Sequence, residues 1–290
     1  MTRALPSPTK ATIIIAAYNE SSVIRHTLQS LLKNQPINNF QILVICNGCS
    51  DNTEHIIQNE FNTVLCHTIP QASKSLAIRY AESLNPGFPR LYLDADIALR
   101  STDATSLIQY AENQPDAALI IPSSLVDTQH CDALVKRFYR AWYNTPFVRQ
   151  LGFGAGTYLL NQAARSRFDI WPELIADDGF IRSQFLSQEI HVLKQHQVRV
   201  KAPKNTNTLI KVKARSKLGN IELREYLSRN PLTKLTVKKT LKRKTHSPNT
   251  LRSSTLDALV YFAVNVCALI LAKWQYFTGS RSWSRDNSNR

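Results

Sequence analysis

The 290-residue sequence has little of what marks several special classes of protein. Its five cysteines are few and odd in number, which argues against a disulfide scaffold and favours a reducing compartment. Charged residues make up 20% against 43% apolar, which excludes a disordered chain, and no repeat period is present. The apolar run at residues 13–17 is too short for a signal peptide, so we expect a cytoplasmic protein.

The formal net charge of +15 is concentrated in one part of the chain. Residues 1–200 hold 17 Lys/Arg and 17 Asp/Glu, whereas residues 201–290 hold 19 and 4. The sequence therefore predicts a neutral globular body, long enough to bury one large core, followed by a basic tail.

Short apolar runs alternate with segments of helical spacing along the body. Strands are expected at 12–17, 41–46, 64–68, 90–93 and 157–160. Helices are expected near 23–32 (with Ser21 or Ser22 as cap), 54–59, 74–84 and 133–143. This alternation indicates an α/β, doubly wound, mostly parallel sheet with helices on both faces. In such sheets the ligand crevice lies at the carboxyl ends of the strands.

Two carboxylates follow the strand expected at 90–93. Asp94 and Asp96, at i and i+2, would project to one side of an extended chain. Their hard oxygen ligands favour Mg²⁺ or Mn²⁺, completed by substrate phosphates. An exposed turn with two solvated aspartates fits the same residues.

A second acidic pair, Asp177 and Asp178, lies between apolar residues on an expected helix. Such a carboxylate can act as a general base, although an acidic helix start would also be favoured by the helix dipole. Lys74 precedes another helix, where it could face a phosphate or simply be solvated.

Two further motifs carry weaker signals. Cys46 and Cys49 could form a dithiol, while a zinc site would need two more ligands at suitable spacing. Gly152, Gly154 and Gly156 lack the setting of a dinucleotide fingerprint and would let a ligand approach the backbone or form a mobile turn.

Five segments carry a family resemblance through their order and spacing. They are residues 13–20 (IIIAAYNE), 46–53 (CNGCSDNT), 88–96 (FPRLYLDAD), 154–156 (GAG) and 175–182 (IADDGFIR). Residues 211–215 (KVKAR), followed by Gly219 and Asn220, are similar to a downstream basic segment of one bacterial subgroup. Between about residues 11 and 223, the chain resembles family 2 glycosyltransferases of the GT-A fold.

The resemblance implies a role for each matching residue. Binding of the nucleotide-sugar donor would involve Ala17, Tyr18, Glu20, Asp51, Lys74, Asp94, Arg215 and Lys217. Asp94 and Asp96 would hold the Mg or Mn ion on the donor diphosphate, and Asp178 would be the catalytic base beside Asp177. The chain departs from the family at Cys46 and Arg79, where Asp and Asn are common, which bears on nucleotide preference and ligand contacts.

The implied function is metal-dependent, inverting transfer of a sugar from a nucleotide-diphosphate donor to an acceptor hydroxyl. The acceptor would be a glycan or lipid-linked molecule in polysaccharide, glycolipid or cell-envelope glycan synthesis, and no nucleic acid is expected. The alternative is a non-enzymatic protein that binds membrane or nucleic acid through its basic tail.

The chain divides into a leader (1–10), a GT-A catalytic domain (11–205), a basic segment contributing to the active site (206–252), an apolar helix (253–278) and a basic tail (279–290). The apolar run 258–272 would be about 22 Å long as a helix, short of a roughly 30 Å hydrocarbon core. It therefore predicts an interfacial helix on the anionic inner face of the cell membrane or a docking helix, with a core helix as the alternative.

Overall fold

The computed structural model describes the chain apart from residues 1–9, 34–39, 146–147, 149–155, 231–253 and 280–290. The chain divides into two compact units. Unit 1 comprises Met1–Ser124, Gly154–Glu173 and Gln184–Arg199. Unit 2 comprises Leu125–Phe153, Leu174–Ser183 and Val200–Arg290.

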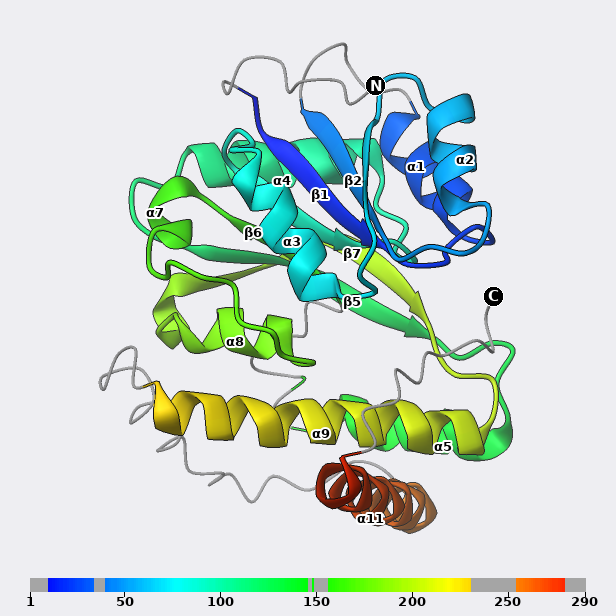
Figure 1. The fold of residues 1–290 in the computed structure, drawn as a ribbon. Helices are drawn as coiled ribbons and strands as arrows, with labels where there is room; N and C mark the ends of the chain where they lie inside the picture. Colours follow the sequence, from blue (N-terminus) through cyan, green and yellow to red (C-terminus); the bar gives the residue numbers. More distant parts are fainter. Residues whose placement is uncertain (1–9, 34–39, 146–147, 149–155, 231–253, 280–290) are drawn as a thin grey trace. The chain divides into compact units, whose positions relative to one another are not determined.

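A seven-stranded sheet, most of it in unit 1, has the strand order β3-β2-β1-β4-β6-β5-β7 (Figure 1). The strands are β1 (Thr12–Ala17), β2 (Gln41–Asn47), β3 (Leu65–Ile69), β4 (Arg90–Asp94), β5 (Leu119–Asp127), β6 (Thr157–Leu160) and β7 (Ile190–Lys201). β1 pairs in parallel with β2 and β4, and β2 with β3, whereas β6 runs antiparallel to β4 and β5. The predicted mostly parallel α/β fold is confirmed.

The core of unit 1 is formed by strands that are buried on both faces. Consecutive residues Ile13, Ile14 and Ile15 of β1 are at most 2% exposed. A parallel strand covered on both sides has no polar face, which explains why its sequence is a continuous β-branched run.

Helices cover both faces of this sheet. They are α1 (Ile24–Leu32), α2 (Thr53–Glu60), α3 (Lys74–Ser83), α4 (Ser101–Glu112) and α7 (Gln162–Arg165), with the 3₁₀ turn η1 at Ser187–Glu189. α3 lies on the face opposite α1 and α4 (Figure 1). The expected serine cap of α1 is wrong, because Val23 is the N-cap and no side chain caps it. The backbone makes the turn instead, with the amides of Val23 and Ile24 donating to Glu20 O at 2.9 and 2.8 Å.

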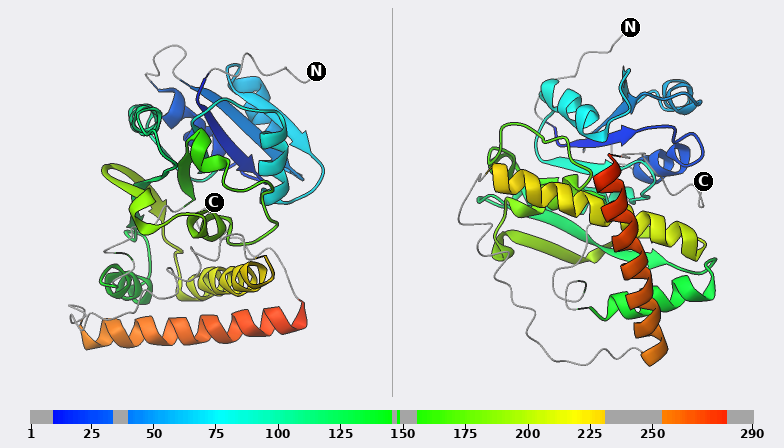
Figure 2. Two further views of the ribbon diagram at one scale, coloured as in Figure 1. Left: turned by 90° about the vertical axis from the view of Figure 1, so that its left-hand side faces the viewer. Right: turned by 60° about the horizontal axis from the view of Figure 1, so that its bottom comes forward.

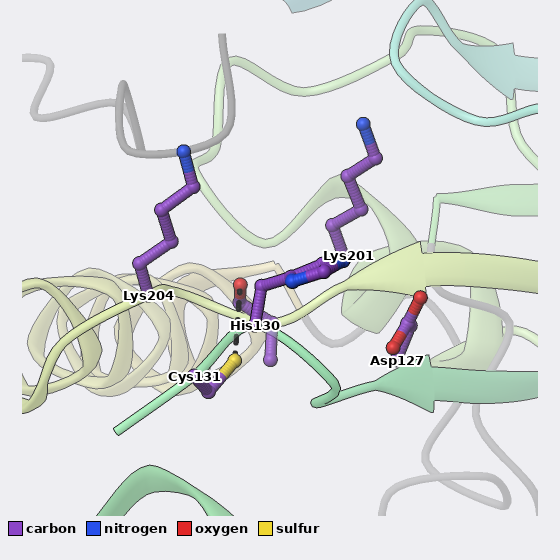
Figure 3. A pocket seen from close by; sticks show the side chains of 6 residues that line it. Asp127, His130, Cys131, Lys201 and Lys204 are labelled. Atoms are coloured by element: carbon purple, nitrogen blue, oxygen red, sulfur yellow. Dashed lines mark hydrogen bonds between the residues drawn. The ribbon is translucent and has the colours of Figure 1, made fainter.

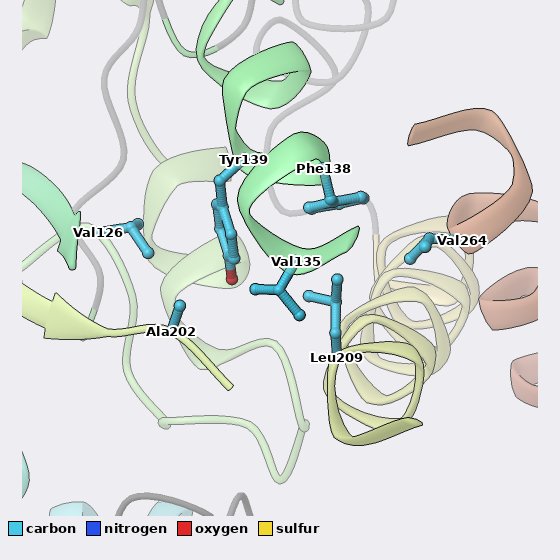
Figure 4. Packing of buried hydrophobic residues seen from close by; sticks show 7 residues of the cluster. All are labelled: Val126, Val135, Phe138, Tyr139, Ala202, Leu209 and Val264. Carbon is cyan, nitrogen blue, oxygen red and sulfur yellow. The ribbon is translucent and has the colours of Figure 1, made fainter. Parts of the chain in front are cut away.

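The described part of unit 2 is built around four helices, α5 (Ala133–Tyr143), α8 (Asp177–Ser183), α9 (Thr206–Arg229) and α11 (Thr255–Thr278). A buried cluster joins α5, α9 and α11 with the segments near residues 126 and 202 (Figure 4). It consists of Val126, Val135, Phe138, Tyr139, Ala202, Leu209 and Val264. A second cluster, Ala214, Leu218, Ala268 and Ala272, joins α9 to α11.

Helix α11 is longer than its apolar run. It spans 24 residues, begins where Asp257 N donates to Ser254 Oγ at 3.2 Å, and ends at Gly279 in the left-handed conformation. At 1.5 Å per residue it is about 36 Å long, so the expectation that it is too short to span a membrane is wrong. Among the described residues it is the one helix long and apolar enough to cross, and an 18-residue stretch of it has a mean hydropathy of 2.0.

Candidate functional site

The carboxyl ends of β1 and β2 are joined by hydrogen bonds in unit 1. Asn19 follows β1 with a positive φ of 51°, a conformation that asparagine tolerates better than most residues. Its Oδ1 accepts from Ser50 N at 2.7 Å and from Asp51 N at 3.3 Å. Cys49 Sγ donates to Ala17 O at 3.3 Å. These contacts hold the loop after β2 against the loop after β1.

A second set of contacts fixes Asp51 beside the start of α1. Its carboxylate accepts from Ser21 N at 3.1 Å and from Thr53 Oγ1 at 2.5 Å, while Glu20 N donates to Thr53 Oγ1 at 2.7 Å. Burial alone would raise the pKa of Asp51, but the hydrogen bonds from Thr53 and Ser21 outweigh it and lower this pKa. Unit 1 therefore brings the segment from Ala17 to Glu20 next to Asp51.

Asp94 ends β4, the strand next to β1, and meets a cation there. Lys74 Nζ, at the start of α3, lies 2.6 Å from Asp94 Oδ1, with both side chains partly exposed. Gly156 backs the carboxylate with a φ of +73°, and its carbonyl accepts from Asp94 N at 2.9 Å. A Cβ on Gly156 would lie 1.9 Å from Asp94 Oδ2, so only glycine fits against this carboxylate.

Asp96 does not lie on an extended chain. Residues 95 and 96 form a turn in which Ile97 N donates to Asp94 O at 3.1 Å, and Asp96 is exposed. The alternation of strand side chains therefore does not apply to this pair, which corrects the geometric reason for expecting the two carboxylates on one side. The turn is anchored by Ala95, whose carbonyl accepts from Thr27 Oγ1 at 2.8 Å.

The second acidic pair lies in unit 2 at the start of α8. Asp177 is buried, whereas Asp178 is exposed and accepts from Gly179 N at 2.7 Å. Two glycines allow α8 to pack closely on α9. A Cβ on Gly179 would lie 2.9 Å from Leu223 Cδ2, and one on Gly219 would lie 3.0 Å from Ala176 N. The accessible carboxylate is thus Asp178, the residue expected to be the base.

The basic residues of α9 point in different directions. Arg215 is four residues before Gly219, so it shares the helix face that meets α8. Lys217 lies instead on the face of Lys213, whose ammonium group is 5.1 Å from the ring centroid of Trp142. Burial, and then the charge of Lys217, lower the pKa of Lys213 to about 8. Burial also lowers the pKa of Lys217.

The cysteine motif does not form a metal centre in the part of the chain that the structure describes. No group of three His, Cys, Asp or Glu side chains there could hold a metal ion. Cys46 Sγ lies 3.8 Å from Cys66 Sγ, and none of the five cysteines forms a disulfide. Hydrogen bonding to Cys49 and Cys66, together with burial, raises the pKa of Cys46. Gly152 and Gly154 lie outside the described residues.

Unit 2 also contains a pocket of about 430 Å³, formed where the chain enters α5 and α9 (Figure 3). Its lining residues are Asp127, His130, Cys131, Lys201, Ala202 and Lys204. None of the residues that the sequence analysis selected lines this pocket.

Four residues shape the surroundings of Asp51, Asp94 and α9 in ways that sequence reasoning did not assign to them. Asn19 and Thr53 orient the loops around Asp51, Gly156 backs Asp94, and Lys213 packs on the aromatic face of α5. Asn19, Thr53 and Gly156 all stand inside the segments that carry the resemblance, which was the available signal. Lys213 lies inside the basic segment 211–215, to which the sequence analysis gave no role at this position.

A family model covers the part of unit 1 that contains Asp51, Lys74 and Asp94. Residues 12–139 match the model of glycosyl transferase family 2. This segment belongs to that family. It contains the loops after β1 and β2, Lys74 and both aspartates of the 94–96 turn. The match supports a glycosyltransferase and favours the enzyme over the non-enzymatic alternative. Among curated proteins, none matches the chain in sequence.

Solved structures of glycosyltransferases share the fold. A mannosyltransferase of Pyrobaculum calidifontis, in complex with GDP-Man and Mn²⁺, has a TM-score of 0.57 and 15% identity over 97% of this chain and 79% of its own. Mannosyl-3-phosphoglycerate synthase of Rubrobacter xylanophilus has a TM-score of 0.56 and 12% identity over 78% and 76%.

Two structures of TarS from S. aureus, one of a fragment and one of a longer chain, are similar to this chain. Its 1–349 fragment in complex with UDP has a TM-score of 0.51 and 16% identity over 97% of this chain and 95% of the fragment. Against a longer TarS chain the TM-score is 0.50 at 17% identity. The similar region comprises 71% of the present chain and spans 38% of that TarS chain. At these identities the likeness shows the GT-A fold alone.

Proposed function

We propose that this glycosyltransferase is metal-dependent and inverting, and that unit 1 binds the nucleotide diphosphate of the donor. The observation that carries the proposal is Asp94, which ends a central strand beside Lys74 and two residues before Asp96. The carboxyl ends of parallel strands are where such folds bind ligands. The neighbours bound to UDP and to GDP-Man with Mn²⁺ support a nucleoside-diphosphate donor and a divalent cation.

Asp94 and Asp96 fit a divalent cation that is completed by substrate oxygens. Mg²⁺ is commonly held by one or two carboxylates together with phosphates, and the described residues offer these two carboxylates without a third side-chain ligand. The ion, when bound, would offset the negative charge that develops on the departing diphosphate. The ammonium group of Lys74, 2.6 Å from Asp94, would pair with a phosphate oxygen of the donor when a cation is held by the carboxylate.

Asp178 acts as the general base in this proposal. It takes the proton of the acceptor hydroxyl as that oxygen bonds to the anomeric carbon and the bond from this carbon to the diphosphate breaks. A single displacement of this kind inverts the anomeric configuration. Arg215, on the face of α9 that meets α8, supplies a fixed cation for the leaving group, and Lys217 supplies another from the face of Lys213.

The acceptor is proposed to be a glycan or lipid-linked molecule, and the reaction part of polysaccharide, glycolipid or cell-envelope glycan synthesis at the inner face of the cell membrane. The basic C-terminal region and the exposed apolar side chains of α11 support a membrane location. No nucleic-acid partner is proposed.

The test is calorimetric titration of the full chain with nucleoside diphosphates in the presence and absence of Mn²⁺. We expect Mn²⁺-dependent binding that Asp96→Ala abolishes. Asp116→Ala, which removes another exposed carboxylate of unit 1, is the matched control and should bind normally. Binding that is unchanged in Asp96→Ala or in a chelator would overturn the metal assignment.

A further inference from the structure

Helix α11 has two faces of opposite character, and its inner face is packed within unit 2. This inner face is formed by Asp257, Tyr261, Val264, Ala268 and Ala272, which contact α5 and α9 (Figures 2 and 4). It is held by both charge and packing. Asp257 accepts hydrogen bonds of 3.0 Å from Arg137 and Arg140, and the Tyr261 ring stacks on Phe138 with centroids 5.2 Å apart.

The outer face of α11 is apolar and exposed along the whole helix. It consists of Leu256, Leu259, Phe262, Val266, Leu269, Ile270, Trp274 and Phe277. Their exposed fractions reach 69% at Phe262, 65% at Ile270 and 81% at Phe277. Lys273 is the one charged side chain exposed on α11, near its C-terminal end. A continuous apolar surface of this kind marks an interaction site.

The packing of the inner face decides how this surface can meet a bilayer. α11 is long enough to span, but it lies against α9, which carries Lys211, Lys213, Arg215, Lys217, Arg224 and Arg229. If α11 crossed the bilayer, either the charges of α9 would enter the hydrocarbon with it, or α11 would have to separate from the helices that cover its inner face. Both are costly, because each charge at the bilayer centre costs about 2.5 kcal/mol or more. A helix that lies in the interface keeps the charges of α9 out of the hydrocarbon and keeps its packing on α5 and α9.

The positive charge of the segments on either side of α11 favours a membrane that contains anionic lipid. Residues 231–253, just before α11, contain seven Lys/Arg and no Asp/Glu, and residues 279–290, just after it, contain three and one. Cations beside an interfacial helix are attracted to anionic lipid, and they add to the burial of its apolar face.

We infer that the outer face of α11 lies in the plane of an anionic membrane, immersed to the headgroup–acyl boundary, while its inner face stays on α5 and α9. The inference deepens the proposed membrane location and is independent of the proposed reaction. It assigns to α11 both the membrane contact and the support of α9, since Ala214 and Leu218, which pack on Ala268 and Ala272, flank Arg215 and Lys217.

The first test is flotation of the full chain with vesicles of phosphatidylcholine, with and without phosphatidylglycerol. We expect binding that rises with the anionic lipid and falls with salt. The double variant Phe262→Asp/Ile270→Asp should lose most of this binding. Ile170→Asp is the matched control, because Ile170 is 69% exposed in unit 1, and it should float like the unsubstituted chain. Equal flotation of all three proteins would overturn the inference.

Depth measurements separate an in-plane helix from a span. Ile270 and Trp274 lie eight and twelve residues after Phe262 on α11, about 12 and 18 Å along its axis, and in-plane burial puts all three at one shallow depth. A spin label at each position, introduced through Phe262→Cys, Ile270→Cys or Trp274→Cys, should report similar shallow depths in anionic vesicles. A depth that changes steadily along the helix, with resistance to alkaline carbonate, would show a span and overturn the inference.

Two further measurements complete the test. Light scattering without lipid shows whether a second copy covers the outer face, and a dimer abolished by Phe262→Asp/Ile270→Asp in a chain that ignores vesicles would overturn the inference. Nucleotide titration of the same variants should be unchanged. A chain that floats as expected but binds no nucleotide would refute the proposed reaction and leave the membrane inference standing.

Discussion

Lys74 Nζ lies 2.6 Å from Asp94 Oδ1, which places the first residue of α3 against the last residue of β4. Because both side chains are partly exposed, the pair is accessible to a ligand and adds little stability. Its main consequence is electrostatic, since the carboxylate proposed to hold a cation already has a positive partner. A metal ion and Lys74 must therefore share Asp94, or the lysine must move to the diphosphate.

Because Lys74 pairs with Asp94, the variant Lys74→Met should change the affinity for Mn²⁺ alone and the affinity for a nucleoside diphosphate in opposite directions. Mn²⁺ alone should bind more tightly, because its competitor on Asp94 is gone. A nucleoside diphosphate with Mn²⁺ should bind about tenfold more weakly, a loss of about 1.4 kcal/mol, because one charge-assisted contact is removed. Calorimetry with each ligand checks both. The control is Lys33→Met, which removes an exposed cation at the end of α1. Unchanged nucleotide affinity would mean that Lys74 stays on Asp94.

Gly156→Ala should displace the Asp94 carboxylate. The added Cβ would meet Asp94 Oδ2 at 1.9 Å, and the φ of +73° adds backbone strain. We expect a loss of about 1–3 kcal/mol of stability and weaker Mn²⁺-dependent nucleotide binding. Gly279→Ala is the matched control, because its φ is +66° and nothing lies within 4 Å of an added Cβ. Denaturant unfolding and calorimetry should separate the two, and equal effects would mean that strain alone matters.

Asp178→Asn should lower kcat by about 10²-fold or more, because the amide keeps the shape of the side chain and loses its basicity. Donor binding should persist, since this residue is not proposed to contact the diphosphate. Asp177→Asn tests the buried neighbour. Single-turnover kinetics with a donor and acceptor would compare them, and normal turnover in Asp178→Asn with loss in Asp177→Asn would reverse the two roles.

The attachment of α11 should depend on pH. Hydrogen bonds from Arg140 and Arg137 lower the pKa of Asp257 to about 2 from an ordinary value of 3.8. The unfolded chain therefore takes up this proton at a higher pH, so the stabilisation is complete above about pH 5 and disappears as pH falls toward 2. Asp257→Asn should cost about 2 kcal/mol at neutral pH, and less as the medium becomes acidic.

Thermal unfolding of both proteins across this pH range is the measurement. Asp169→Asn, which alters an exposed carboxylate in unit 1, should parallel the unsubstituted chain at every pH. A constant difference between Asp257→Asn and the unsubstituted chain down to the lowest pH would contradict the assigned ion pair.

The strands of unit 1 were predictable because burial on both faces leaves a simple pattern. The continuous run at β1 and its counterpart at β2 need no knowledge of their neighbours, since a covered parallel strand must be apolar throughout. The antiparallel β5 and the long β7 were missed. The apolar run at the start of β5 is short and is followed by Pro122 and two serines, and many residues of β7 are partly exposed, so no continuous apolar run marks the full length of either strand.

The chemistry of the two acidic pairs was also visible in sequence, because residue types and spacing set which groups can bind a cation or take a proton. Which carboxylate is accessible was not visible. The turn after β4 exposes Asp96, and the close packing of Gly179 and Gly219 places Asp178 outside and Asp177 inside. Contacts between segments far apart in the chain decide such exposure.

In the C-terminal region, too, some features follow from the sequence alone and others depend on the tertiary structure. The sequence by itself determined that residues 258–272 form an apolar segment and that the excess positive charge lies in residues 201–290. Only the tertiary structure decided that the helix continues to Thr278 and that Asp257, Val264, Ala268 and Ala272 are covered. Hydrophobicity is a property of each residue, whereas the face that remains exposed depends on which partner helices cover the others.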